Sequence, residues 1–130
     1  MTLVLDDSAQ AGWLMPDESG ADLVALAGRH DVFAAPMLLW AEIRNILIVA
    51  ERRGRMSREH VDQAVETIGE LGIVLDTAPS SAAVVGLCRR HGLTAYDALY
   101  LDLALRETAD LATLDAALAK AARAEGVEVP

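Results

Sequence analysis

The chain has 130 residues, of which 53% are hydrophobic and 4% aromatic, and its formal net charge is −9 at pH 7. This length suits one domain with a real core and is too short for two, and the hydrophobic content excludes a disordered chain. The negative charge excludes a protein that holds nucleic acid by net charge alone, and so few aromatic residues leave no stacking platform for single-stranded bases. We therefore expect a single domain over residues 1–130.

Cysteine usage and hydropathy indicate a cytoplasmic protein. Cys88 is the only cysteine, which excludes an internal disulfide and suits a reducing compartment. Asp6 and Asp7 interrupt the only apolar run near the N-terminus, which argues against a signal peptide. The apolar stretch 38–50 contains charged residues and is too short to span a bilayer. We expect no membrane association.

Strands and helices are expected to alternate in the first half of the chain. Residues 2–5 predict a strand buried on both faces, and 9–14 and 17–29 predict two helices around Pro16. A second strand is expected at 31–35. The longest helix is expected at 37–53, where apolar residues recur at helical spacing and Glu42 lies along the same stripe.

The alternation continues in the second half. Ser57 begins a helix that runs to Leu71, and further helices are expected at 80–91, 96–106 and 116–124. Short strands are expected at 73–75 and 111–113, and 127–129 is a candidate edge strand. This pattern predicts an α/β fold with a central, mainly parallel sheet of four or five short strands and right-handed crossovers.

Four acids stand where this fold would build a site. Asp6 and Asp115 follow strands, Asp97 lies in the opening turn of a helix, and Glu42 faces inward on the longest helix. The carboxyl ends of parallel strands meet at one edge, so we expect the acids to converge there. Converging carboxylates raise one another's pKa unless a cation neutralises them. Oxygen ligands favour Mg²⁺ or Mn²⁺, and such a metal can activate water to hydrolyse a phosphodiester.

Each acid also has a purely structural interpretation. Thr94 and Asp97 have the spacing of a capping box, and Asp115 suits the N-cap of the helix that follows it. Glu42 could sit at the edge of its stripe, reaching water or pairing with an arginine. Serine and cysteine triads are poorly supported, and the three histidines lack the spacing of zinc ligands. The convergence of all four acids is what favours chemistry over capping.

Four segments carry a family resemblance in their order and spacing: Leu3–Ser8, Trp40–Leu47, Arg89–Tyr100 and Leu111–Asp115. Together they resemble the PIN domain nucleases, most closely the VapC toxins of bacterial toxin–antitoxin pairs, over nearly the whole chain. The resemblance implies a PIN-like α/β/α sandwich and a Mg²⁺-dependent endoribonuclease whose catalytic, metal-binding residues are Asp6, Glu42, Asp97 and Asp115. It also implies an RNA substrate, a homodimer and a cognate antitoxin whose segment covers the site.

Two further acids need placing. Asp7 occupies a position that is usually a small residue or threonine in the family, so it either reaches a second metal or is solvated in the turn. We favour the solvated interpretation because adjacent strand residues point to opposite faces. Asp102 is roughly 140° around its helix from Asp97 and should not join the cluster.

The basic residues fall in two groups. Arg44, Arg52, Arg53, Arg55 and Arg58 share one segment, and Arg89 and Arg90 adjoin the proposed site. Arginine suits bidentate contact with phosphate, although charge runs of this kind also occur as solvated helix ends. Both interpretations remain open.

Two other functions remain to be weighed against the nuclease. One is a catalytically silent PIN-like module that binds RNA or protein. The other is a phospho-accepting receiver domain, since Asp6 and Asp7 imitate its acidic pair and Asp76 follows the third strand. A receiver also needs a lysine late in the chain, and the only lysine, Lys120, lies inside a predicted helix.

Overall fold

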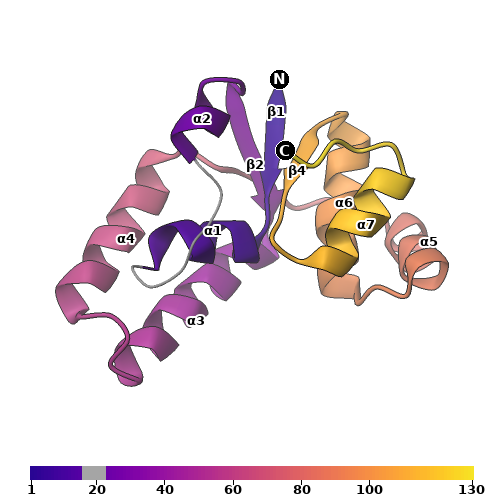
Figure 1. Cartoon of the computed structure of the whole chain (residues 1–130). Coiled ribbons are helices and arrows are strands. Elements are labelled where there is room, and N and C mark those ends of the chain that lie inside the picture. Colours follow the sequence, from indigo (N-terminus) through magenta and orange to yellow (C-terminus); the bar gives the residue numbers. More distant parts are fainter. Residues whose placement is uncertain (16–22) are drawn as a thin grey trace.

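The computed structural model describes residues 1–15 and 23–130, which form a sheet of four parallel strands in the order β3-β2-β1-β4 (Figure 1). The strands are β1 Thr2–Leu5, β2 Val32–Pro36, β3 Val74–Asp76 and β4 Asp110–Ala112. Each neighbouring pair runs parallel, so all four carboxyl ends lie at one edge. The predicted α/β class and parallel sheet are confirmed.

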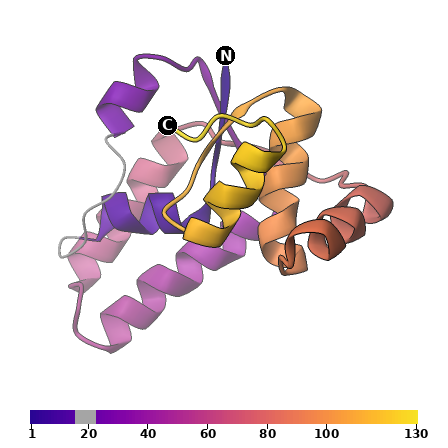
Figure 2. The same ribbon diagram turned by 45° about the vertical axis from the view of Figure 1, so that its right-hand side comes forward.

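Helices cover the sheet on both sides. They are α1 Asp7–Leu14, α2 Leu23–Ala27, α3 Leu38–Arg52, α4 Arg58–Glu70, α5 Ser81–His91, α6 Ala95–Glu107 and α7 Ala116–Ala124. Figures 1 and 2 show α3 and α4 on one side of the strands and α5, α6 and α7 on the other. Among the described residues, no helix has both the length and the apolar character needed to cross a membrane.

The central strand β1 is buried on both faces, as its continuous apolar sequence predicts. Leu3 and Leu5 pack in one apolar cluster with Ala9 and Leu26, whereas Val4 points into the larger cluster on the other face. At the carboxyl edge the chain passes from β1 through Asp6 into α1.

Local signals in the sequence set several helix ends. Ser57 caps α4 by accepting a hydrogen bond from the His60 amide at 3.2 Å, as predicted. Thr94 caps α6 in the same way, with the Asp97 amide at 3.2 Å. Gly92 ends α5 with φ of 66°, in the left-handed region that favours glycine.

Two predicted elements differ from the structure. Residues 127–129 form no strand: a single backbone bond, from the Leu111 amide to the Glu128 carbonyl at 3.0 Å, replaces the expected ladder. Val127 is nonetheless buried, so its apolar character reflects packing rather than strand pairing. The helix expected at 17–29 is described only from Leu23, where it forms α2, and residues 16–22 lie outside the described part.

A buried pair that the sequence did not predict lies at the amino edge of the sheet. His30 Nε2 is 2.8 Å from Asp110 Oδ2, and His30 Nδ1 is 2.7 Å from the Leu26 carbonyl oxygen. The contact joins the turn after α2 to the first residue of β4. It therefore holds the strand that leads to Asp115 from the end opposite the acids.

Helix α3 is fixed to the core by the apolar stripe that the sequence predicts. Its buried residues are Leu39, Ile43, Leu47 and Ala50, at helical spacing. This packing matters for function because the same helix carries Glu42.

We expect Leu47→Ala to lower the free energy of unfolding by about 3 kcal/mol, because it leaves a cavity at a side chain that is 1% exposed. The matched control is Ile48→Ala on the same helix, at a side chain that is 36% exposed, with an expected loss under about 1 kcal/mol. Urea unfolding at equilibrium measures both values. Equal losses for the two variants would contradict this account of how α3 packs.

Candidate active site

Asp6 lies where β1 becomes α1, and it is 2% exposed. Its Oδ1 accepts hydrogen bonds from the Ala9 amide and the Ser8 hydroxyl, both at 2.8 Å. Its Oδ2 accepts a hydrogen bond from the Thr113 hydroxyl. An ionised carboxylate has about four acceptor positions, so these three donors leave about one for a further partner. Asp6 thus caps α1 and still has acceptor capacity.

The hydroxyls of Ser8 and Thr113 extend this network to the end of β4. Ser8 Oγ accepts a hydrogen bond from the Leu114 amide at 2.9 Å, and Thr113 Oγ1 accepts one from the Asp115 amide at 3.0 Å. The β1–β4 pairing makes this possible because Leu5 is in register with Ala112. Asp6 and Asp115, which are far apart in sequence, are therefore tied through two shared side chains.

Asp115 also caps α7, as its structural interpretation predicts. Its Oδ1 accepts a hydrogen bond from the Leu118 amide at 3.0 Å. A cap of this kind needs one carboxylate oxygen. Capping and a further role at the site are therefore compatible for Asp115.

Glu42 is held by a partner on another helix. The hydroxyl of Tyr100 donates a hydrogen bond to Glu42 Oε1 at 2.8 Å. Tyr100 is buried on α6, one turn beyond Asp97, so one helix supplies both an acid and the group that orients Glu42. Burial and the neighbouring Glu42 raise the pKa of Tyr100, which keeps its hydroxyl protonated as the donor. Sequence reasoning did not identify Tyr100.

The pKa values show that the acids share one neighbourhood. Burial raises the pKa of Asp6 to about 6, although its hydrogen bonds act in the opposite direction. Burial, followed by the charges of Asp7, Asp97 and Asp6, raises the pKa of Glu42. Burial, followed by the charges of Asp115 and Asp7, raises the pKa of Asp97. Because such influences fall off with distance, these carboxylates lie near enough to affect one another's ionisation.

Asp7 adds its charge to this cluster, and the preference for a solvated side chain over a second metal ligand stays a prediction. The argument from strand alternation fails because β1 ends at Leu5 and Asp7 is the first residue of α1. Asp7 is half-buried, and its charge raises the pKa of Asp6, Glu42 and Asp97. The local negative potential is therefore stronger than the four predicted acids alone would produce.

Other charged residues are engaged elsewhere. Asp102 is buried and accepts a hydrogen bond from Arg106 Nε at 2.9 Å, so it stays apart from the acids as predicted. Arg90 and His91 both contact Glu125, at 2.7 and 3.0 Å. The Arg90 guanidinium therefore already has a carboxylate partner.

The donor set fits a divalent cation in its chemistry. All the acidic side chains offer oxygen. Burial is the main cause of the raised pKa values of Asp6, Glu42 and Asp97, and the charges of neighbouring carboxylates raise them further. In residues 1–15 and 23–130, no three Asp, Glu, His or Cys side chains converge into a ready-made metal site. Repulsion of this kind is what a cation would relieve as it draws carboxylates together. The roles of the four acids as metal ligands and catalysts stay predictions.

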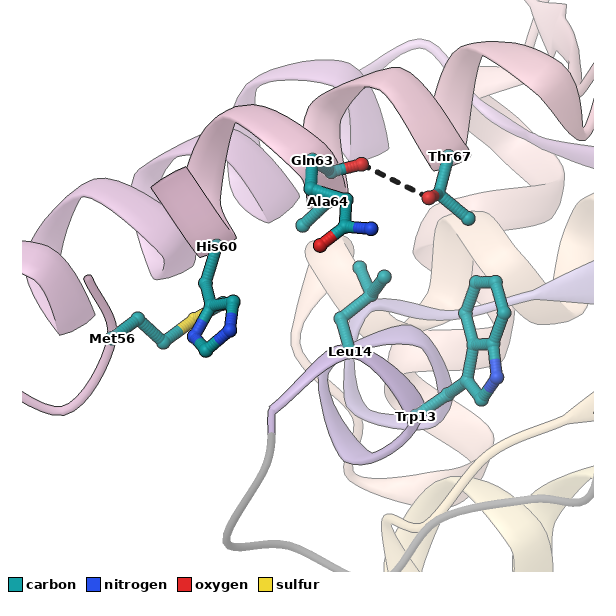
Figure 3. Close-up of a pocket in the computed structure, with 7 residues that line it drawn as sticks. All are labelled: Trp13, Leu14, Met56, His60, Gln63, Ala64 and Thr67. Carbon is teal, nitrogen blue, oxygen red and sulfur yellow. Dashed lines mark hydrogen bonds between the residues drawn. The ribbon is translucent and has the colours of Figure 1, made fainter. Parts of the chain in front are cut away.

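A separate hollow of about 290 Å³ lies between α1 and α4 (Figure 3). Among the described residues, its lining contains no carboxylate and is formed by Trp13, Leu14, Met56, His60, Gln63, Ala64 and Thr67. It is therefore distinct from the acidic cluster.

The fold and the site define a parallel α/β domain with crowded carboxylates at the carboxyl edge of its sheet. Comparison with known families agrees: the model of the PIN domain matches residues 3–124, and the chain belongs to the PIN domain family. It is 31% identical over 124 residues to Ribonuclease VapC3 of Pyrobaculum aerophilum, covering 92% of this chain and 94% of that protein.

Solved structures support the same fold. A crystal structure of a Pyrobaculum aerophilum protein superposes with a TM-score of 0.68 at 22% identity, covering 93% of this chain and 84% of that one. The crystal structure of FitAcB from Neisseria gonorrhoeae gives a TM-score of 0.66 at 17% identity, covering 98% and 95%. At these identities the likeness establishes the arrangement of helices and strands.

The raised pKa of Asp6 predicts a pH dependence of stability in the metal-free protein. The folded state holds a proton on Asp6 up to about pH 6, whereas the unfolded state loses it near 3.8. The free energy of unfolding is therefore highest below pH 3.8 and falls as the pH rises through about 6. We expect the free energy of unfolding to fall by about 2 kcal/mol more in the wild type than in Asp6→Asn between about pH 4 and pH 7.

Urea unfolding in EDTA across this pH range measures the difference. Asp62→Asn, at an exposed position on α4, is the control and should follow the wild-type curve. If the free energy of unfolding changed with pH equally in the wild type and in Asp6→Asn, the raised pKa of Asp6 would be contradicted.

Proposed function

We propose that this protein is an endoribonuclease toxin of the VapC type, which hydrolyses RNA phosphodiester bonds with Mg²⁺, or with Mn²⁺ in its place. The catalytic and metal-binding residues in this proposal are Asp6, Glu42, Asp97 and Asp115. The observation that carries it is the crowding of carboxylates with raised pKa values at one edge of the sheet. The relative named Ribonuclease VapC3 supports the substrate class.

A bound cation would supply the positive charge that offsets these carboxylates. When bound, it acts as a Lewis acid that stabilises negative charge developing on the phosphodiester. Asp6 is the most rigid ligand in the proposal because three donors already fix its orientation. The Tyr100 hydroxyl orients Glu42 by donating a hydrogen bond to its Oε1.

The half-buried acids also suit proton transfer. A carboxyl whose pKa is raised towards neutrality takes up a proton more readily than an ordinary carboxylate. Glu42 and Asp97 are both partly open to solvent and have raised pKa values. We assign to one of these two the removal of a proton from the attacking water.

A cognate antitoxin is proposed as the partner that covers the site. Tyr96 is 62% exposed and precedes Asp97, and Leu114 is 51% exposed and precedes Asp115. Large apolar side chains beside acidic ones offer both burial and orientation to a protein partner. The homodimer and the cytoplasmic location stay predictions, from the family resemblance and from the lone Cys88.

The alternatives have less support. In a receiver domain Asp76 would accept the phosphoryl group, but Arg106 holds its carboxylate in an ion pair at 2.6 Å. Lys120, the only lysine that could serve as the one a receiver requires, is exposed on helix α7. A catalytically silent binding module would keep the acids without cutting RNA, and the cleavage experiment separates it from the nuclease.

We expect Asp97→Asn to lower the rate of RNA cleavage by about 10²-fold or more, because it removes a charge from the reacting centre. EDTA should abolish wild-type cleavage, and added Mg²⁺ or Mn²⁺ should restore it. Glu66→Gln, at an exposed position on α4, is the matched control and should cut at the wild-type rate. The rates are measured on labelled RNA, with circular dichroism to confirm that each variant is folded.

Two results would contradict the proposal. Undiminished cleavage in EDTA would exclude a divalent metal as the cofactor. Cleavage by Asp97→Asn at the wild-type rate would exclude the acidic cluster as the active site. Metal binding without any cleavage by the wild type would favour the silent module.

A further inference from the structure

We propose that a groove along α3 binds the single-stranded RNA on one side of the cut, and that Arg53 at its far end contacts a backbone phosphate. The identity of the ligand as RNA rests on the proposed function. The course of the groove rests on the structure of α3 and its neighbours.

One face of α3 leads from the acidic cluster to Arg53. Glu42, Ile46, Val49 and Arg53 are separated by four, three and four residues, so they form one stripe along the helix. At 1.5 Å of rise per residue, Arg53 lies about 16 Å along the axis from Glu42. Figure 1 shows α3 running away from the strands in this direction. The stripe therefore connects the site to a distant basic end.

A hollow of about 240 Å³ follows this stripe, beginning one turn beyond Glu42. Its lining includes the apolar residues Ile46, Val49 and Ala50 and the polar residues Asn45, Arg53 and Arg55. Met15, at the end of α1, lines the other wall. Helix α1 begins beside Asp6 and ends beside this hollow, and α3 likewise carries Glu42 before it reaches the hollow. An apolar surface beside arginines suits the sugars of a strand on one side and its phosphates on the other.

The charge of this region is opposite to that of the rest of the chain. Residues 44–58 contain five arginines and one acid, Glu51, whereas the whole chain has a net charge of −9. Two arginines outside this region are paired, Arg90 with Glu125 at 2.7 Å and Arg106 with Asp76 at 2.6 Å. Within the described ranges, Arg53 and its neighbour Arg52 take part in no ion pair, which leaves their guanidinium groups for an external anion. Arginine binds phosphate more specifically than other cations do.

RNA fits this arrangement better than an acidic protein segment. A strand that is cut internally must continue beyond the cut, so part of it has to lie along the surface next to the acids. Phosphates repeat along the RNA strand. One of them lies at the cleavage site, where a cation neutralises it, and those farther along are bound best by basic side chains. The α3 groove provides the second contact at the distance of a short run of nucleotides.

The test compares two adjacent arginines that lie at different positions around the axis of α3. Arg52 and Arg53 carry the same charge, but they lie about 100° apart around the helix, so only Arg53 is on the stripe. Removing either changes the net charge by one and alters the long-range field equally. A difference between the two variants therefore reports a direct contact.

Binding of labelled single-stranded RNA is measured by fluorescence anisotropy in the Asp97→Asn background with Mg²⁺. For an RNA of about 12 nucleotides, we expect Arg53→Ala to weaken binding up to about fivefold. Its logarithmic salt dependence should become shallower by about 0.7, the value of one phosphate contact on a single strand. Arg52→Ala should change both much less, and Arg53→Lys should keep most of the salt dependence. A dinucleotide should bind all variants equally because it cannot reach Arg53.

Several results would overturn the proposal. These are unchanged binding in Arg53→Ala, equal losses in Arg52→Ala and Arg53→Ala, and losses that are the same for the dinucleotide. Loss of affinity for a polyglutamate peptide without loss for RNA would assign the groove to a protein partner instead. Anisotropy does not depend on cleavage, so the groove can be supported even if the wild type cuts no RNA, which would refute only the proposed function.

Discussion

The burial of Asp6 at the carboxyl end of β1, beside other carboxylates, is the constraint around which the candidate site is built. The sheet buries Asp6 because β1 runs through the centre of the core, and hydrogen bonds from Ser8, Ala9 and Thr113 offset only part of the lost hydration. Asp7 and the acids of α3 and α6 add further negative charge. Such a cluster lowers the free energy of unfolding of the metal-free protein, and a cation that binds among the acids would raise it again.

The scaffold holds this cluster from several directions. Glu42 comes from a helix anchored by buried Leu47 and is held by Tyr100, while Asp115 follows a strand fixed at its other end by the pair of His30 and Asp110. Rigid elements of this kind keep carboxylates close despite their repulsion. The same anchoring of α3 gives the groove towards its arginine-rich end a fixed course.

Sequence reasoning predicted the parts of the fold and site that depend on local pattern. The alternation of strands and helices placed Asp6 and Asp115 at one edge, and helical periodicity placed Glu42 facing inward. It missed the pairing of Tyr100 with Glu42, 58 residues apart, and that of His30 with Asp110, 80 residues apart. Such contacts depend on how helices pack across the sheet, and no short-range pattern encodes them.

The central claim is that a divalent cation binds among these acids. It is tested most directly by a crystal structure of the protein soaked in Mn²⁺, with the metal located by its anomalous scattering. The account predicts an anomalous peak coordinated by oxygens of Asp6 and Asp97, with Glu42 and Asp115 turned towards it. A peak elsewhere on the protein, or none at saturating Mn²⁺ with these carboxylates still apart, would contradict it.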